Sequence, residues 1–269
     1  MTTPARPKRV RLPHLQEAKE GGRRITMLTA YDALTAPILE AAGVDMLLVG
    51  DSLGNVMLGL DSTLGVTMED MESATRAVAR STSRPLLVAD LPFGAYETSV
   101  AQAFESAARL MRAGAHAVKL EGGEERVPAV RGLVQNGIPV MGHLGYTPQS
   151  EHALGGPRLQ GRGDEGEKLW ADALALQEAG AFAVVLEMTP ARLAQQVTEA
   201  LKIPTIGIGA GPACDGQVLV WSDMAGMTEW TPSFVHRFAE LGSALRDAAS
   251  AYVNAVEDGT FPGPTNYRV

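Results

Sequence analysis

The chain has 269 residues, of which 45% are hydrophobic and 20% are charged, and its formal net charge at pH 7 is −8. This composition is ordinary for a folded domain, and the length is close to the roughly 250 residues of one closed α/β barrel. The acidic balance argues against a nucleic acid as partner, and no apolar run approaches the roughly 18 residues that span a membrane. Cys214 is the only cysteine, which excludes an internal disulfide and a cysteine-based zinc site. We therefore expect a cytoplasmic protein whose thiol is incidental.

The first segment in chain order, residues 1–24, is basic. It holds seven Lys and Arg residues against Glu17 and Glu20, a net charge of +5 that leaves −13 for the rest of the chain. The segment also contains three prolines and has a weak amphipathic pattern. We interpret it as an arm that is either solvated or in contact with a neighbouring subunit.

Short apolar runs rich in β-branched residues recur after this arm, and alanine-rich amphipathic stretches lie between most of them. The runs predict strands at 25–30, 46–50, 85–89, 117–120, 139–142, 183–186, 204–208 and 218–221. The stretches predict helices at 33–42, 68–80, 99–113, 165–179 and 191–201, with a last one at 233–257. Three helices close on an Ala-Gly pair, at Gly43, Gly114 and Gly180, where glycine takes the left-handed cap conformation without a steric penalty.

This alternation predicts repeated βαβ units and a parallel sheet, and continuous apolar strands indicate a sheet covered on both faces. Eight strands favour closure into a barrel, and the main rival, a Rossmann-type sheet, lacks a G-x-G-x-x-G motif after the first strand. We therefore predict a single (β/α)8 TIM barrel domain over residues 1–269, with an N-terminal helical arm and a C-terminal helix. The Gly/Pro-rich tail at 258–269 should be extended.

Polar residues, most of them ionisable, occupy the predicted strand ends, which is where barrel enzymes build their active sites. Moving along the chain, these residues are Asp51 and Ser52 after the second strand, Asp90 after the third, Lys119 and Glu121 at the fourth, His143 after the fifth and Glu187 after the sixth. Because all C-terminal strand ends meet at one mouth, we expect these side chains to converge. A glycine-rich segment at 206–211 would let a ligand approach the backbone closely.

Three of the acids, Asp51, Asp90 and Glu121, predict a metal site. Carboxylates held close together repel one another, and a divalent cation removes that cost. All-oxygen ligation favours Mg²⁺ first and Mn²⁺ second, and zinc is less suited because cysteine is absent from these positions. Taken singly, Asp51 could instead cap a turn or helix, and Asp90 could cap the end of its strand.

The other three residues each allow more than one role. Glu187 follows an apolar strand, which would suit a proton acceptor, although it could also be a structural ion-paired glutamate. Lys119 could be a Schiff-base nucleophile, a cation that neutralises a substrate carboxylate, or a structural partner of Glu121. His143 could donate to a developing oxyanion or simply anchor its loop.

Several segments, in order, resemble the ketopantoate hydroxymethyltransferase family, also called 3-methyl-2-oxobutanoate hydroxymethyltransferases. They are TMLTAYD (26–32), VGDSLG (49–54), ADLPF (89–93), VKLEGG (118–123), GHLG (142–145), TPQS (147–150), GRGD (161–164), IGIGAG (206–211) and DGQVLV (215–220). One such segment would be a weak signal, whereas this ordered set, spanning about residues 25–225, is highly specific.

The resemblance implies transfer of a hydroxymethyl group from 5,10-methylenetetrahydrofolate to 3-methyl-2-oxobutanoate, giving 2-dehydropantoate for pantothenate and coenzyme A. It further implies Mg²⁺ held by Asp51 and Asp90 with Glu121 in the shell of the metal, and a homo-oligomer that is commonly a decamer. Asp51, Ser52, Asp90 and Lys119 correspond to substrate-binding positions and Glu187 to the proton acceptor. The partners are then a 2-oxo acid and a folate, with neither a nucleic acid nor a membrane.

Three other functions fit parts of the pattern. Another magnesium-dependent enolate former, such as a carbon–carbon lyase or a relative of phosphoenolpyruvate mutase, would share the fold and the metal. A Schiff-base aldolase would use Lys119 and would not need a metal. A non-catalytic barrel would need none of the strand-end acids, so their presence argues against it.

Overall fold

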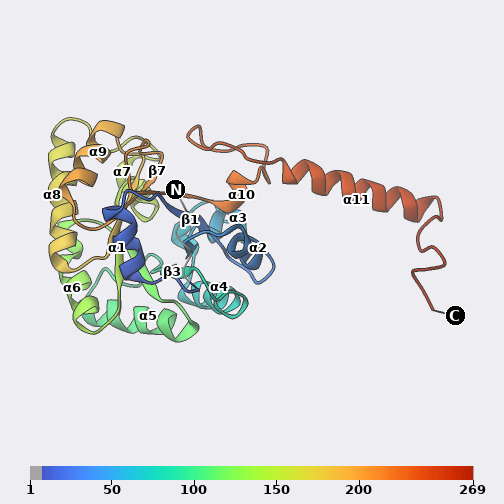
Figure 1. The fold of residues 1–269 in the computed structure, drawn as a ribbon, viewed down its shortest axis with the longest axis horizontal. Helices are drawn as coiled ribbons and strands as arrows, with labels where there is room; N and C mark the ends of the chain where they lie inside the picture. Colours follow the sequence, from blue (N-terminus) through green and yellow to red (C-terminus); the bar gives the residue numbers. More distant parts are fainter. Residues whose placement is uncertain (1–7, 269) are drawn as a thin grey trace. The chain divides into compact units, whose positions relative to one another are not determined.

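The structure, a computed structural model that describes residues 8–268, contains a closed barrel of eight parallel strands (Figure 1). Each strand pairs with the next, and β1 pairs with β8 to close the ring. The strands are β1 (Ile25–Thr29), β2 (Met46–Val49), β3 (Leu86–Asp90), β4 (Ala117–Glu121), β5 (Val140–Gly145), β6 (Ala183–Glu187), β7 (Thr205–Ile208) and β8 (Gly216–Leu219). The predicted barrel is confirmed, and every strand lies within three residues of its expected bounds.

Helices surround the barrel and connect its strands (Figure 1). The main ones are α2 (Thr35–Ala42), α4 (Met68–Ser81), α5 (Val100–Ala113), α6 (Val127–Gln135), α8 (Asp164–Ala179) and α9 (Ala191–Ala200). Shorter turns are α3 (Leu53–Val56), α7 (Glu151–Leu154), η1 (Thr63–Gly65), η2 (Glu124–Arg126) and η3 (Pro148–Ser150). The three predicted glycine caps are confirmed, because Gly43, Gly114 and Gly180 have φ values of 90°, 115° and 102°.

The chain divides into two compact units, Met1–Val220 and Trp221–Val269. The second unit contains α10 (Trp221–Met224) and α11 (Leu241–Glu257), and α11 has no buried residue. The predicted C-terminal helix is therefore present, but it begins at Leu241 rather than 233, and residues 229–240, which include Pro232, form neither helix nor strand. Among the described residues, no helix combines the length and apolar character needed to cross a membrane.

Helix α1 (Leu12–Glu20) contributes to the barrel core instead of extending into solvent. Leu15 and Ala18 are 1% and 3% exposed and belong to the same cluster as Ile25 and Met141 of the strands. Their i, i+3 spacing gives the short helix one apolar stripe. The interpretation of the arm as a solvated tail is therefore wrong for this part of it, and residues 1–7 lie outside the described residues.

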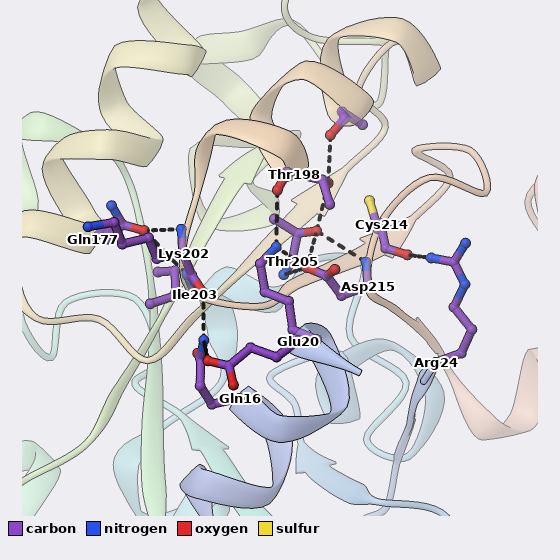
Figure 2. A network of polar contacts seen from close by, with 12 residues as sticks. Gln16, Glu20, Arg24, Gln177, Thr198, Lys202, Ile203, Thr205, Cys214 and Asp215 are labelled. Atoms are coloured by element: carbon purple, nitrogen blue, oxygen red, sulfur yellow. Dashed lines mark hydrogen bonds and ion pairs between the residues drawn. The ribbon is translucent and has the colours of Figure 1, made fainter. Parts of the chain in front are cut away.

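A polar network ties α1 to β7 and β8, which are connected by residues 209–215 without an intervening helix (Figure 2). Asp215 Oδ2 accepts hydrogen bonds from the backbone N of Thr205 at 2.8 Å and from its hydroxyl at 3.2 Å. Lys19 Nζ of α1 lies 2.8 Å from the same oxygen. Cys214 is buried beside this network, and burial raises the pKa of its thiol, which fits the expected absence of a nucleophilic role.

We expect Asp215→Ala to destabilise the barrel, because it leaves the Lys19 ammonium and the Thr205 N–H without their partner in a site where both side chains of the ion pair are 14% exposed. Loss of one member of a largely buried pair costs about 3 kcal/mol. Urea unfolding of the variant should show this loss. Asp61→Ala, at an exposed position, is the matched control and should change stability by less than about 0.5 kcal/mol. Equal losses in the two variants would contradict the role of the network.

Candidate active site

Six ionisable side chains meet at the C-terminal end of the barrel. They come from five consecutive strands, with Asp51 just after β2, Asp90 at the end of β3, Lys119 and Glu121 in β4, His143 in β5 and Glu187 at the end of β6. Glu187 has a side chain that is 16% exposed, and the other five residues are at most 4% exposed. The expected convergence is therefore observed, and it places four carboxylates and two bases in one buried mouth.

Asp90 joins its neighbouring strands through both carboxylate oxygens. Its Oδ2 accepts from the backbone N of Asp51 at 3.0 Å, and Lys119 Nζ lies 2.9 Å from its Oδ1. The helix-capping interpretation of Asp51 is therefore wrong, since Ser52 is the N-cap residue of α3, whereas Asp90 accepts the backbone N–H that follows the end of β2. Lys119 pairs with Asp90 rather than with Glu121, because the register of β3 and β4 sets Asp90 opposite Lys119.

His143 lies between two carboxylates. Its Nδ1 is 3.3 Å from Glu121 Oε1, and its Nε2 is 3.2 Å from Glu187 Oε2. Burial and the nearby Lys119 lower the pKa of His143, but the close carboxylates of Glu121 and Glu187 outweigh them and raise it to about 9. The ring is therefore a cation at neutral pH that links the two glutamates, and its polar contacts are with side chains of the site rather than with its own loop.

The backbone around Glu187 is tightly constrained. Met188, directly after it, has φ of 45°, a left-handed conformation that is unusual for a residue with a side chain. Gly145 of β5 has φ of 92°, and a Cβ there would lie 2.1 Å from the Glu187 carbonyl oxygen. The same carbonyl accepts from the backbone N of Tyr146 at 2.9 Å. Neighbouring backbone thus constrains the main chain at Glu187, whose side chain contacts His143.

Ser52 lies beside the carboxylates and contacts Tyr31, which follows β1. The two hydroxyl oxygens are 2.9 Å apart. Burial raises the pKa of Tyr31, so its phenol stays protonated. The next residue, Asp32, lies outside this group of contacts, because its carboxylate accepts from the backbone of Leu34 and Thr35.

Two uncharged residues that the sequence analysis did not single out also belong to the site. Gln149 Nε2 donates to Asp51 Oδ2 at 2.9 Å, and its backbone N donates to Glu121 Oε2 at 2.9 Å. The Tyr96 hydroxyl donates to Gln149 Oε1 at 2.6 Å. Neither residue is charged, so a search of the sequence for charged residues does not find them. The one sequence signal was that Gln149 lies in the TPQS segment at 147–150.

The charge of the mouth suits a divalent cation. With all four carboxylates ionised, Lys119 and a protonated His143 leave two negative charges uncompensated. Burial, together with Asp90 and Glu121, accordingly raises the pKa of Asp51 to about 8. Glu121 Oε1 is buried and accepts no hydrogen bond with good geometry within residues 8–268.

The described residues do not form a ready-made cage, because no group of three or more His, Cys, Asp or Glu side chains is arranged to hold an ion. Mg²⁺ usually takes only one or two carboxylates and completes its shell with water and substrate oxygens. Two carboxylates, such as those of Asp51 and Asp90, are within the number that Mg²⁺ takes from a protein, so the residues of the mouth are compatible with such an ion.

Asp51→Asn should stabilise the metal-free protein. The pKa of Asp51 in the fold, about 8, lies above its ordinary value near 3.8, so the folded chain binds more protons than the unfolded chain in that window. Stability of the wild type must then fall as pH rises through the window. In EDTA at pH 8.5, we expect the Tm of the variant to exceed that of the wild type by at least roughly 2–4 °C, the shift that about 1 kcal/mol gives in a domain of this size.

The difference in Tm between Asp51→Asn and the wild type should be smaller at pH 6, where Asp51 is protonated in the wild type. Asp61→Asn is the control and should track the wild type at both pH values. A difference in Tm that becomes smaller as the pH rises would contradict the raised pKa of Asp51 as its cause.

A closed (β/α)8 barrel with a buried group of acids and bases at its C-terminal mouth defines an enzyme that acts on small molecules. The sequence profile of ketopantoate hydroxymethyltransferase matches residues 9–264. The chain therefore belongs to the ketopantoate hydroxymethyltransferase family and is a transferase.

Individual relatives agree with this assignment. The 3-methyl-2-oxobutanoate hydroxymethyltransferase of Leifsonia xyli subsp. xyli is 56% identical over 260 residues, covering 96% of this chain and 94% of the relative. The proteins of the same name from Acidothermus cellulolyticus and Corynebacterium glutamicum are 58% and 57% identical over 258 residues. Each alignment covers 95% of this chain, and 95% and 96% of the respective relative.

Solved structures of lower identity share the fold. A phosphonopyruvate hydrolase in complex with oxalate and Mg²⁺ has a TM-score of 0.63 at 14% identity, covering 97% of this chain and 92% of the other. A 2,3-dimethylmalate lyase of the PEP mutase/isocitrate lyase superfamily has a TM-score of 0.60 at 19% identity, covering 96% and 91%. At these identities, the likeness shows the barrel alone.

Proposed function

We propose that the enzyme transfers a hydroxymethyl group from 5,10-methylenetetrahydrofolate to 3-methyl-2-oxobutanoate through an enolate that Mg²⁺ stabilises. The product would be 2-dehydropantoate, which leads to pantothenate and coenzyme A. The observation that carries the proposal is a buried group of four carboxylates opposed by two cations, in which Glu187 stands apart from Asp51, Asp90 and Glu121. A metal-assisted deprotonation needs this pairing of a cation site with a base.

Asp51 and Asp90 would hold Mg²⁺, and Glu121 would reach it through water. When bound, the ion would polarise the keto group of the substrate and balance the negative charge that develops there. A barrel of the same fold binds oxalate together with Mg²⁺, and oxalate presents a pair of oxygens much as a 2-oxo acid does. Lys119 and Ser52 would bind the substrate, with the Lys119 ammonium balancing its carboxylate.

Glu187 would take the proton from C3 of the substrate. Its carboxylate lies at the open side of the group, and the His143 contact at 3.2 Å holds it in place. The C3 carbon would then form its new bond to the one-carbon unit of the folate, and a water oxygen would complete the hydroxymethyl group. Both C–N bonds that hold this carbon would break, and tetrahydrofolate would leave with the proton from C3 and one proton from the water. His143, as a cation, could also steady an oxyanion.

The alternative functions are less well supported. Burial by itself would lower the pKa of Lys119, but the carboxylates of Asp90, Glu121 and Asp51 raise it above its ordinary value. A permanently protonated amine is a poor Schiff-base nucleophile, which argues against the aldolase. Family membership separates the enzyme from other enolate-forming barrels, and a non-catalytic barrel would gain nothing from a buried and repulsive set of acids.

We also propose that the enzyme is a cytoplasmic homo-oligomer, a decamer as the sequence resemblance implies. Helix α11 exposes Leu245, Tyr252 and Val253 by 62%, 59% and 48%, which is an apolar surface typical of a subunit contact. Native mass spectrometry at micromolar concentration should show a single species of ten chains. A monomer under these conditions would contradict the proposal.

Incubation with 3-methyl-2-oxobutanoate and methylenetetrahydrofolate should yield 2-dehydropantoate, detected by mass spectrometry. EDTA should abolish product formation, and added Mg²⁺ should restore it, because the proposed deprotonation depends on the cation. Omission of the folate is the control that separates this reaction from that of a lyase. Product formation that is insensitive to EDTA would contradict the role of the metal.

Glu187→Gln should bind the 2-oxo acid but lose exchange of its C3 proton with deuterated water. We expect the exchange rate, followed by NMR without folate, to fall by at least about 10²-fold, the contribution of a general base. Glu178→Gln, at an exposed position of α8, is the matched control and should exchange at the wild-type rate. Unimpaired exchange in Glu187→Gln would show that another group is the base.

A further inference from the structure

One uncharged side chain connects two of the acids in the mouth. Gln149, from η3 after β5, is 6% exposed. Its side-chain amide donates to Asp51 Oδ2, and its backbone N donates to Glu121 Oε2, both at 2.9 Å. Asp51 follows β2 and Glu121 ends β4, so β3 separates them in the barrel. A single residue thus holds two carboxylates that strand pairing alone does not bring together.

The orientation of the Gln149 amide follows from its partners. Oε1 accepts from the Tyr96 hydroxyl at 2.6 Å, and Nε2 donates to the Leu91 carbonyl at 2.9 Å as well as to Asp51. A flipped amide would direct its oxygen at a carboxylate and a carbonyl, which are both acceptors. The phenol, which can donate to Oε1, thereby selects the orientation in which the amide donates to Asp51.

Tyr96 is itself fixed on two sides. Its hydroxyl accepts from the backbone N of Glu121 at 3.2 Å, and the Arg126 guanidinium lies 5.5 Å from the centre of its ring. The side chain is 3% exposed. Tyr96 therefore connects the loop after β3 to the end of β4 and holds the Gln149 amide from a rigid position.

We propose that Gln149, oriented by Tyr96, is a positioning residue that sets the rotation of the Asp51 and Glu121 carboxylates for a divalent cation. The inference rests on the proposed function. The amide occupies Oδ2 of Asp51 and leaves Oδ1 for the ion, while the backbone N occupies Oε2 of Glu121. A neutral donor suits this task, because a lysine or arginine in its place would repel the cation. Partners of metal-ligand carboxylates affect metal affinity in this way.

The test is the Mg²⁺ affinity of the metal-free full chain, measured by isothermal titration calorimetry. Gln149→Met keeps the backbone N–H and a similar volume but removes the amide, and its Mg²⁺ Kd should rise roughly tenfold. Tyr96→Phe should raise Kd less, in the same direction. Because Tyr96 acts through Gln149, the double variant should resemble Gln149→Met alone rather than show the product of the two effects. Activity of both single variants should recover at saturating Mg²⁺, which a general loss of structure would not allow.

Gln160→Met is the matched control. Gln160 is buried to a similar degree, 7% exposed, but its amide donates to the Arg158 carbonyl and contacts none of the carboxylates. Its Mg²⁺ Kd should stay within about twofold of the wild-type value, as expected for a change remote from the ligands.

Unchanged Mg²⁺ affinity in Gln149→Met, with wild-type circular dichroism, would overturn the inference and leave the proposed function standing. Independent, multiplicative effects in the double variant would also overturn it, because Tyr96 would then act by another route. If Gln149→Met does not fold, the Tyr96→Phe variant provides the test, and an unchanged Mg²⁺ Kd in that variant overturns the inference. A wild-type protein that binds no Mg²⁺ would overturn the proposed metal site and the inference together.

Discussion

The mouth of the barrel holds more negative charge than its own cations balance, and this shortage of positive charge determines the properties of the site. Four carboxylates are brought together by four strands, β2, β3, β4 and β6, and within residues 8–268 only Lys119 and His143 oppose them. Desolvation makes the imbalance costly, which is why the pKa of Asp51 rises to about 8. A protein gains nothing in stability from such an arrangement, and in the proposed function the strain prepares a cation site.

The barrel can tolerate this strain because the rest of its structure is well packed. Alternate strand residues fill the interior, and α1 closes one end with Leu15 and Ala18. The Asp215 network stabilises the junction of β7 and β8, where a connecting helix is missing. These features lie away from the carboxylates, and the hydrophobic core and the strained mouth are thus separate parts of one unit.

The sequence predicted the barrel well because strands buried on both faces are continuous apolar runs. It predicted a helical N-terminal arm without the bounds or the packing of α1, and it missed α6. Both helices are short, contain prolines near their first turns and have amphipathic patterns that span few residues. It also found the charged residues of the mouth but not their pairing. Lys119 and Glu121 are close in sequence, yet the register of β3 and β4 makes Asp90 the partner of Lys119. Gln149 and Tyr96 come from different loops and carry no charge, so only the folded chain shows that they meet.

The distribution of the two cations divides the acids into sets with different tasks. Lys119 compensates Asp90, and His143 lies between Glu121 and Glu187. Asp51 has only the neutral Gln149 amide as a side-chain partner among the described residues, so the uncompensated charge is centred there. A cation bound at Asp51 would lie across the mouth from the His143–Glu187 contact, because the strands that carry them are on opposite sides of the barrel. A carboxylate that ligates a cation is a weak base, because the ion withdraws its electron density. In the proposed mechanism, Glu187 lies apart from the carboxylates that would hold the metal, with His143 between it and Glu121, and so it binds no metal ion when it accepts the proton.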